Sequence, residues 1–261
     1  MFGLKLRVLG CFFWLFFCAM GARAEPIEIL VGGYPFEPFV EGNLGVTPGF
    51  IALLNSHQNR YRFKFVPIPA QRRYELLETG KIDAIFFEMR QWGWQNKKAV
   101  ADVTKPIISG RELFVTLRTR KDAAFLLKEP TEQKMALTLG YHYAFADYNS
   151  DQDFLKGQFD TLFAPKQRTA IKYLVSGSAD VAMASEIFLH AEYLRDSDLE
   201  QQLLLSSNED QFYELPHLVR QGADITVEAL HEILDSLVEC ECLSSFFASY
   251  GLQRLLTYPP E

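Results

Sequence analysis

The sequence predicts an α/β protein made of two similar lobes. A phrase that occurs twice carries this prediction: Leu-x-x-Gly-x-x-Asp followed by a small or apolar residue, at 77–84 and again at 174–181. Each copy follows a helix-like stretch and runs into an apolar, strand-like stretch. Because glycine supplies the left-handed residue that ends a helix, each copy indicates a helix that turns directly into a buried strand. Two such units far apart in one chain favour two α/β lobes.

Residues 1–24 are predicted to be a signal peptide. Two basic residues precede an apolar run at 8–20, and 22–24 has the small-x-small pattern of a cleavage site after Ala24. The run is shorter than the roughly 20 residues that cross a bilayer, which argues against a membrane anchor. The sequence before Cys11 loosely resembles a lipoprotein processing site, but cleavage there would leave no proper apolar core. We therefore expect a periplasmic protein whose mature chain begins at Glu25.

Charge and composition exclude several classes of partner. Without residues 1–24 the chain carries 23 basic and 33 acidic residues, a formal net charge of −10. Nucleic acids require a basic surface, so this balance argues against a nucleic-acid partner and against anionic membrane surfaces. Hydrophobic residues make up 48% of the sequence, which is enough for sizeable cores.

Two cysteines remain in the mature chain, Cys240 and Cys242. In an oxidising compartment they could form a small disulfide, and buried thiols are the alternative. Two thiols do not complete a structural zinc site, and the five histidines are scattered along the sequence. We therefore expect no metal and no cofactor.

In the first half, apolar runs alternate with helix-like stretches. Residues 27–31 form an apolar run that ends at two glycines, and 61–66 alternates polar and apolar residues, so both predict strands. Helices are expected where a proline opens a stretch with apolar residues on one face, at 48–54 and 69–77. The first copy of the repeated phrase then leads into a strand at 82–87.

The second half continues the same alternation. Strands separated by helices indicate a parallel or mixed sheet, and the absence of a linker-like segment favours lobes joined by crossing strands. A turn at 239–241 would divide the last helix around the two cysteines. The expected order is strand 113–117, strand 135–139, a helix near 154–155, an extended piece at 161–163, helix 170–175, strand 179–184, helix 187–194, strand 215–219 and a helical region at 225–250.

Several phrases, taken in order, resemble the bacterial extracellular solute-binding proteins of family 3, which have the type 2 periplasmic-binding fold. They are the aromatic and proline-rich loop 33–39, the helix opening 48–50, both copies of the repeated phrase, the stretch 102–107 and the strand 218–222. The resemblance implies that lobe 1 comprises residues 25–116 and 216–261, and lobe 2 residues 117–215, with hinge strands crossing between them. It also implies a monomer that closes on a small-molecule ligand in the cleft and delivers it to a membrane importer, a permease with an ATPase.

The chain departs from this family at positions that hold α-amino acids. The family's arginine before the stretch at 102–107 is missing, and Arg90 is the candidate substitute. The aspartate that follows Gly-Phe is Ile51, and the amine-binding aspartate of the second lobe falls at Ser185, next to Glu186. The family's Gly-Thr-Thr loop corresponds to 140–143. These differences argue against a standard α-amino acid as ligand.

Ligands of open α/β sheets bind beyond the carboxyl ends of the strands, which selects four loops of this chain. They are 34–39, 88–94, 140–143 and 185–186. The candidate ligand-binding residues in these loops, together with one arginine at a helix start, are Tyr34, Phe36, Phe39, Arg72, Glu88, Arg90, Trp92, Tyr141, His142, Tyr143, Ser185 and Glu186.

Each candidate has a structural alternative. The aromatic residues of 34–39 could form a cleft wall or pack locally. Glu88 and Arg90 could hold a ligand or pair with each other at the surface. Arg72 at a helix N-terminus suits an anion, whereas solvated arginine is the commoner fate. Glu186 could hold an amine or simply begin a helix. The glycines and aspartates of the repeated phrase are expected to be structural.

The leading functional hypothesis is a periplasmic solute-binding protein, not an enzyme, that captures an amino-acid-like ligand or small carboxylate for an ABC-type importer. The second is an exported dehydratase-like enzyme on the same fold, which would need a general acid such as Glu88 or Glu186. No nucleophile–base set is visible in the sequence, so no catalytic residue is assigned. A third is an orphan or sensory binding protein that signals to a membrane partner.

Overall fold

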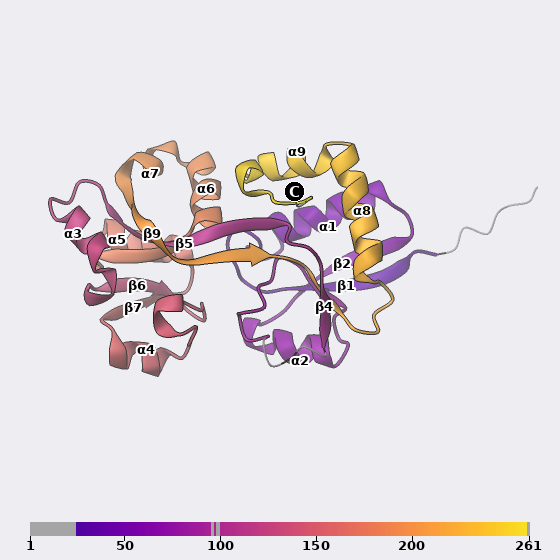
Figure 1. Ribbon diagram of the computed structural model, residues 1–261, viewed down its shortest axis with the longest axis horizontal. Coiled ribbons are helices and arrows are strands. Elements are labelled where there is room, and N and C mark those ends of the chain that lie inside the picture. The colour runs from indigo at the N-terminus through magenta and orange to yellow at the C-terminus, as the bar shows by residue number, and fades with distance from the viewer. Residues whose placement is uncertain (1–24, 95–96, 98–99, 260–261) are drawn as a thin grey trace, which may run out of the picture.

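The computed structural model describes residues 25–94, 97 and 100–259, so the predicted signal peptide lies outside the described residues. Two five-stranded sheets form the framework, in the orders β2-β1-β3-β10-β4 and β7-β6-β8-β5-β9. Figure 1 shows them in two lobes placed side by side, with the long strands β5 (Ile108–Leu117) and β9 (Leu203–Leu215) running between the lobes. No helix among the described residues is long and apolar enough to cross a membrane.

The first lobe contains both ends of the described chain. In its sheet, β1 runs parallel to β2 and β3, whereas β10 is antiparallel to β3 and β4. Its core gathers apolar side chains from β1, α1, α8 and α9. The elements are β1 (Ile27–Gly33), α1 (Val46–His57), β2 (Tyr61–Pro67), η1 (Ala70–Arg72), α2 (Arg73–Glu78), β3 (Ala84–Ile85), β4 (Ala101–Val103), β10 (Leu218–Arg220), α8 (Val227–Glu239), α9 (Cys242–Ala248) and η4 (Gln253–Leu255).

The second lobe is built from the middle of the chain. Here β6 runs parallel to β7 and β8, and β5 is antiparallel to β8 and β9. Helices α5 and α6 pack on this sheet around a core rich in alanine and leucine. Besides β5 and β9, the elements are α3 (Ala123–Lys128), η2 (Pro130–Glu132), β6 (Met135–Thr138), η3 (Ala144–Ala146), α4 (Gln152–Gln158), β7 (Thr161–Ala164), α5 (Gln167–Val175), β8 (Val181–Ser185), α6 (Glu186–Arg195) and α7 (Ser197–Gln202).

The repeated phrase adopts the same structure in both lobes. Gly80 and Gly177 have φ of 69° and 72°, the left-handed conformation that ends α2 and α5. The backbone N–H of Asp83 then donates to the carbonyl of Leu30 in β1, and that of Asp180 donates to the carbonyl of Lys134, directly before β6. The carboxylates of Asp83 and Asp180 each accept a hydrogen bond from an arginine that is distant in the sequence, at 2.9 and 2.8 Å. The phrase is therefore structural, as predicted.

The predicted strand 215–219 is divided between two strands that belong to different sheets. β9 ends at Leu215 in the second sheet, and β10 begins at Leu218 in the first. β9 itself was not expected from the sequence, because its centre at 206–210 is polar. β5 and β9 also contribute to the first lobe's core through Ile108 and Leu215. The lobe boundaries, proposed at 116/117 and 215/216, therefore stay a prediction.

Cys240 and Cys242 form a disulfide across the turn between α8 and α9. Glu241 makes this turn with a φ of 56°, so the helical region expected at 225–250 consists of two helices. His57 lies next to the disulfide, with a ring nitrogen within 4.8 Å of both sulfur atoms. Because the sulfurs are bonded to each other, they offer no pair of thiolates to a metal ion in this state.

Candidate functional site

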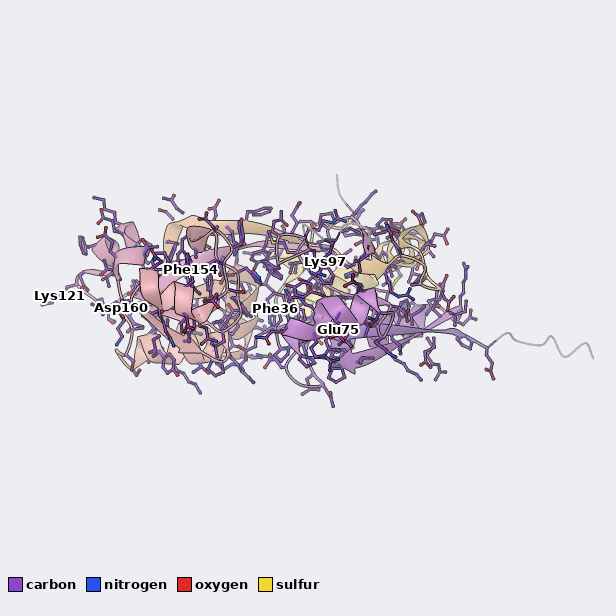
Figure 2. The ribbon with its side chains drawn as sticks, turned by 90° about the horizontal axis from the view of Figure 1, so that it is seen from below. Phe36, Glu75, Lys97, Lys121, Phe154 and Asp160 are labelled. Atoms are coloured by element: carbon purple, nitrogen blue, oxygen red, sulfur yellow. A yellow bond between two sulfur atoms is a disulfide. The ribbon has the colours of Figure 1, made fainter. Side chains whose placement is uncertain are left out.

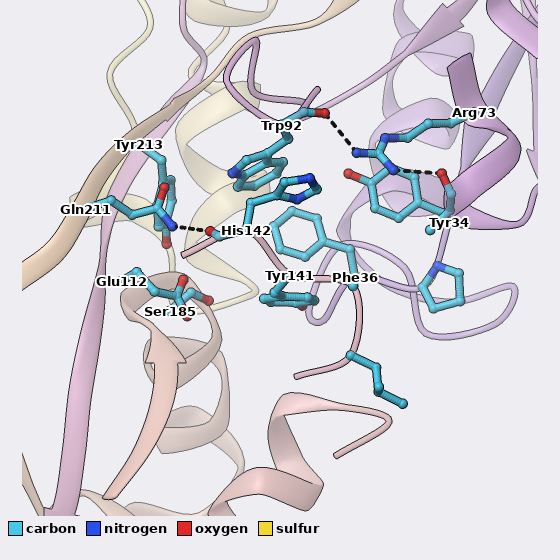
Figure 3. A pocket seen from close by; sticks show the side chains of 14 residues that line it. Tyr34, Phe36, Arg73, Trp92, Glu112, Tyr141, His142, Ser185, Gln211 and Tyr213 are labelled. Carbon is cyan, nitrogen blue, oxygen red and sulfur yellow. Dashed lines mark hydrogen bonds between the residues drawn. The ribbon is translucent and has the colours of Figure 1, made fainter. Parts of the chain in front are cut away.

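A cavity of about 60 Å³ lies between the two lobes. An enclosed water occupies roughly 10–15 Å³, so the space suits a small ligand rather than a single water. Side chains from both lobes face each other across it (Figure 3). The lining residues are Tyr34, Pro35, Phe36, Ala70, Arg73, Trp92, Glu112, Leu139, Gly140, Tyr141, His142, Ser185, Gln211 and Tyr213.

The carboxyl ends of parallel strands place most of this lining. β1 ends at Gly33 and leads into the aromatic loop, β6 ends at Thr138 and leads into 139–142, and β8 ends at Ser185. This is the arrangement expected for open α/β sheets. The crossing strands β5 and β9 add side chains from a third side, namely Glu112, Gln211 and Tyr213.

Phe36 is the centre of an aromatic cluster that spans both lobes. Its ring lies 5.4 Å from Trp92 and 5.9 Å from Tyr141 between ring centroids, in edge-to-face contacts. Tyr34 stacks on Phe36 at 6.3 Å, and Tyr213 lies 6.4 Å from Trp92. Figure 2 shows Phe36 between the two lobes. The cavity thus has aromatic walls from the loop after β1, from the loop after β6 and from β9.

Arg73 closes the first-lobe end of the cavity, and its guanidinium is held by the protein. It donates hydrogen bonds to the carbonyls of Ala70 and Trp92 at 2.7 and 3.0 Å. Its Nε lies 3.5 Å from Glu88, whose side chain is fully buried and accepts a 2.8 Å hydrogen bond from Tyr34. Burial raises the pKa of Glu88, while Arg73 and the Tyr34 hydroxyl act to lower it. The arginine charge is therefore largely compensated.

Glu112 has a different environment. Its residue is 4% exposed, and its Oε1 has no hydrogen-bond partner among the described residues. Burial, and then repulsion by Asp210, raise the pKa of this carboxyl well above its ordinary value. His142 is a half-buried residue of the same lining, where burial, and then the charge of Arg73, lower its pKa to about 4. Both side chains therefore favour their neutral forms.

Gln167, which is fully buried at the start of α5, connects the lobes below the cavity. Its Nε2 lies 3.2 to 3.3 Å from the carbonyl of Glu37, the hydroxyl of Tyr141 and the hydroxyl of Ser185. Its Oε1 accepts a 2.7 Å hydrogen bond from the backbone of Ser185. Ser185 is also the N-cap of α6 and accepts a hydrogen bond from Phe188.

A group of five charged residues, called the rim cluster below, also joins the lobes. Arg168 binds Glu37 at 3.0 Å, Glu41 at 3.3 Å and Glu192 at 2.7 Å. Arg195 binds Glu192 at 2.7 Å and Glu41 at 3.1 Å. The first-lobe loop after β1 supplies two of the carboxylates, and α5 and α6 of the second lobe supply the rest. None of the five lines the cavity.

Half of the residues predicted for the site line the cavity. They are Tyr34, Phe36, Trp92, Tyr141, His142 and Ser185.

The other six lie elsewhere. Phe39 and Tyr143 are buried in the lobe cores, since their rings point away from the cavity into apolar clusters. Glu88 is buried behind Tyr34, and Glu186 binds Arg111 at 2.8 Å instead of facing a ligand. The two remaining residues are arginines at the surface: Arg72 pairs with Glu75, and Arg90 is exposed near the carbonyl of Ala101.

Sequence reasoning missed four polar or aromatic lining residues: Arg73, Glu112, Gln211 and Tyr213. Arg73 stands next to the predicted Arg72, so the error is one position. The other three lie on the crossing strands, which the loop rule does not select. A signal for Glu112 was present, because it is an acid flanked by the apolar run 113–115 of a strand.

No protein-family model matches the chain, and no curated protein matches it. Solved structures do match: a mutant of ArgBP from T. maritima is 18% identical with a TM-score of 0.63, over 85% of this chain and 94% of that one. A histidine kinase sensor domain with similarity to periplasmic binding proteins is 19% identical with a TM-score of 0.61, over 87% and 97%. AncCDT-1, an ancestral amino-acid-binding protein described as a precursor of cyclohexadienyl dehydratase, is 16% identical with a TM-score of 0.63, over 85% and 95%.

At these identities the likeness shows the fold. The chain has the two-lobed, periplasmic-binding-protein-like α/β fold, and the predicted resemblance is confirmed at that level.

Proposed function

We propose that this chain is an exported solute-binding protein that closes its two lobes on a small polar ligand and delivers it to a membrane importer of the ABC type. The observation that supports this most is the cavity, which is lined by both lobes and by the strands that cross between them. A ligand that contacts both lobes binds the closed form more tightly than the open form. It therefore shifts the protein toward the closed form by the difference between these two binding free energies, which couples binding to closure. The periplasm is the compartment that the sequence of residues 1–24 favours.

A thermal-shift screen of residues 25–261 tests the binding function. Candidate ligands are amino acids, small carboxylates, amines and aromatic acids. A ligand at about 100 times its dissociation constant adds roughly 2.7 kcal/mol to the stability of the protein, which gives a clear rise in Tm. We expect at least one such hit, with the ligand recovered intact. A folded protein that no compound stabilises would contradict the proposal.

A pair of variants ties the hit to the cavity. Phe36→Leu removes the ring at the centre of the aromatic cluster while it keeps an apolar side chain, and should weaken binding at least tenfold. Phe125→Leu makes the same change at a residue that is 59% exposed on the second lobe, and should leave the affinity unchanged. Equal affinities of the two variants would place the binding site elsewhere.

A dehydratase-like enzyme is the second candidate, because the cavity contains a buried carboxyl that favours its protonated form. Burial and Asp210 raise the pKa of Glu112, which is the property that a general acid needs. The likeness to a precursor of cyclohexadienyl dehydratase supports the same candidate. Consumption of a hit compound during incubation would favour the enzyme, whereas intact recovery favours the binding protein.

A sensory role is the third candidate, supported by the likeness to a histidine kinase sensor domain. Ligand binding and closure are common to both roles, so the screen does not separate them. The neighbouring genes do: a permease and an ATPase favour import, and a kinase or cyclase favours signalling.

A further inference from the structure

Two neighbouring residues of the cavity lining each have a buried oxygen atom without a hydrogen-bond partner among the described residues. Glu112 on β5 and Gln211 on β9 are directly paired in the register of these strands. Their residues are 4% and 6% exposed, and both line the cavity (Figure 3). Among the described residues, neither Oε1 of Glu112 nor Oε1 of Gln211 has a hydrogen-bond partner. An unpaired buried acceptor is costly, so an N–H donor in the cavity would stabilise this pair.

The orientation of Gln211 makes its oxygen an acceptor for a ligand. Its Nε2 donates a 2.7 Å hydrogen bond to the carbonyl of His142, and a carbonyl can only accept. The amide nitrogen is therefore fixed on His142, and the oxygen remains for another donor. Together with the carboxyl of Glu112, the wall offers two neighbouring acceptors.

Among the described residues, no basic side chain is paired with Glu112. Arg73 lines the same cavity, but it is bound to Glu88 and to two carbonyls. Arg111, the neighbour in sequence, binds Glu186 through two of its nitrogens at 2.8 and 3.1 Å. The other titratable groups that act on Glu112 or are influenced by it are Asp210 and the hydroxyls of Tyr141, Tyr143 and Tyr213. All of these are acids, and His142 favours its neutral form.

The remaining walls also suit a cation. Rings of Tyr34, Phe36, Trp92, Tyr141 and Tyr213 line the cavity. The faces of aromatic rings attract cations, and desolvation strengthens this attraction. A carboxylate ligand would instead meet an arginine that is already paired with Glu88 and the amide oxygen of Gln211, which repels it.

We propose that the ligand is a small amine, bound as its ammonium ion, whose N–H groups donate to Glu112 and Gln211 while its apolar part packs against the aromatic walls. This inference rests on the proposed binding function and narrows its ligand class. It differs from the sequence-based expectation of an amino-acid-like ligand or a small carboxylate, because no carboxylate is required.

Two series of compounds with matched apolar parts test the proposal on residues 25–261 by calorimetry. The first is 3-methylbutylamine, 4-methylpentanoate and leucine, and the second is phenethylamine, 3-phenylpropanoate and phenylalanine. Within each series, the amine should bind at least tenfold more tightly than the carboxylate.

Glu112→Gln should weaken amine binding at least tenfold, since it keeps the shape of the side chain but removes its charge. Glu209→Gln, the same change at an exposed position of β9, should leave it unchanged.

A second readout separates a direct contact from a structural effect of the substitution. Burial and Asp210 favour the neutral form of Glu112, so an ammonium ligand should expel its proton into the buffer. Binding heats measured in buffers of different ionisation enthalpy should reveal this proton for the wild type and not for Glu112→Gln.

Three results would overturn the amine assignment. In the first two, carboxylates bind as tightly as amines, or Glu112→Gln binds the amine as the wild type does; the binding function would then stand with another ligand class. In the third, neither these compounds nor the wider screen stabilises the wild type, and the proposed function itself fails.

Discussion

The environment of one side chain can differ sharply from that of its neighbour in sequence, as Arg72 and Arg73 show. Arg72 ends the turn η1 and Arg73 begins helix α2, and successive residues of such turns are rotated by about 100–120°, so the two side chains point in different directions. Arg73 is buried against Glu88 and stacks over the rings of Tyr34 and Tyr74 at 4.8 and 4.2 Å, whereas Arg72 is exposed. The sequence predicts that a helix begins near these residues. It does not predict the first residue of that helix to within one position.

The Arg73–Glu88 pair should contribute strongly to stability. Glu88→Gln leaves a buried guanidinium without its counter-charge, which should lower the free energy of unfolding by roughly 3 kcal/mol or more. Glu78→Gln is the control, because Glu78 pairs with Lys97 at the surface and its loss should cost about 0.5 kcal/mol or less. Urea denaturation of the two variants measures the difference. Similar losses of stability in both variants would show that the buried ion pair contributes no more than the surface pair.

Glu112 should make the stability of the empty protein depend on pH. Its folded-state pKa is raised by burial and by Asp210, so its contribution is fully present below the unfolded pKa of about 4.3 and is lost as the pH rises toward the folded value. Glu112→Gln should therefore gain stability relative to the wild type as the pH rises from 4.5 to 8, by at most about 1.4 kcal/mol per pH unit. Thermal melts across this range measure the gain. A constant difference would mean that the carboxyl is not shifted.

At the scale of elements, local signals predicted the repeated units well. A glycine after a helix and an aspartate before a strand are short-range features, and both copies have the expected structure. The crossing strands were only partly predicted, because β9 contains the polar run 206–210 and is defined by its pairing with β5. This pairing extends from Ile108 opposite Leu215 to Leu117 opposite Leu203, contacts that no local pattern encodes. Three site residues were missed for this reason.

Three glycine substitutions test the structural role of the repeated phrase. Gly80→Ala and Gly177→Ala force a side chain into a left-handed conformation and should each cost roughly 1–2 kcal/mol. At Gly177 the cost is conformational alone, because an added Cβ would meet no atom of the described chain within 4 Å. Gly157→Ala is the control: it lies within helix α4 with the same free space, and should stabilise by about 0.5–1 kcal/mol. Denaturation midpoints give the signs, and a loss at Gly157 would contradict this account.

At the scale of the whole molecule, the contacts that join the two lobes include the aromatic cluster, Gln167 and the rim cluster. The rim cluster connects the lobes by charge without touching the cavity, so it favours closure whether or not a ligand is bound. The sequence did predict two lobes joined by crossing strands. It did not predict the rim cluster, because Glu37 and Arg168 are 131 residues apart.

Arg168→Gln should shift the empty protein toward an open form. The variant removes the ion pairs of Arg168 with Glu37, Glu41 and Glu192, so small-angle X-ray scattering should show a larger radius of gyration. Ligand affinity should fall as well, because the closed form becomes less populated. Arg62→Gln, at an exposed position of β2, should change neither quantity. If the wild type and Arg168→Gln have the same radius, the rim cluster does not hold the lobes together.

The position of Trp92 gives the protein an optical reporter of its own. The sequence has three tryptophans, at 14, 92 and 94, and only the last two remain after the predicted cleavage. Trp94 is buried against Tyr74 at 4.7 Å, far from solvent, whereas Trp92 lines the cavity and contacts rings from both lobes. Opening or filling the cavity changes the surroundings of one indole and not the other. Intrinsic fluorescence, with Trp94→Phe to remove the constant background, would therefore follow occupancy in real time without any label.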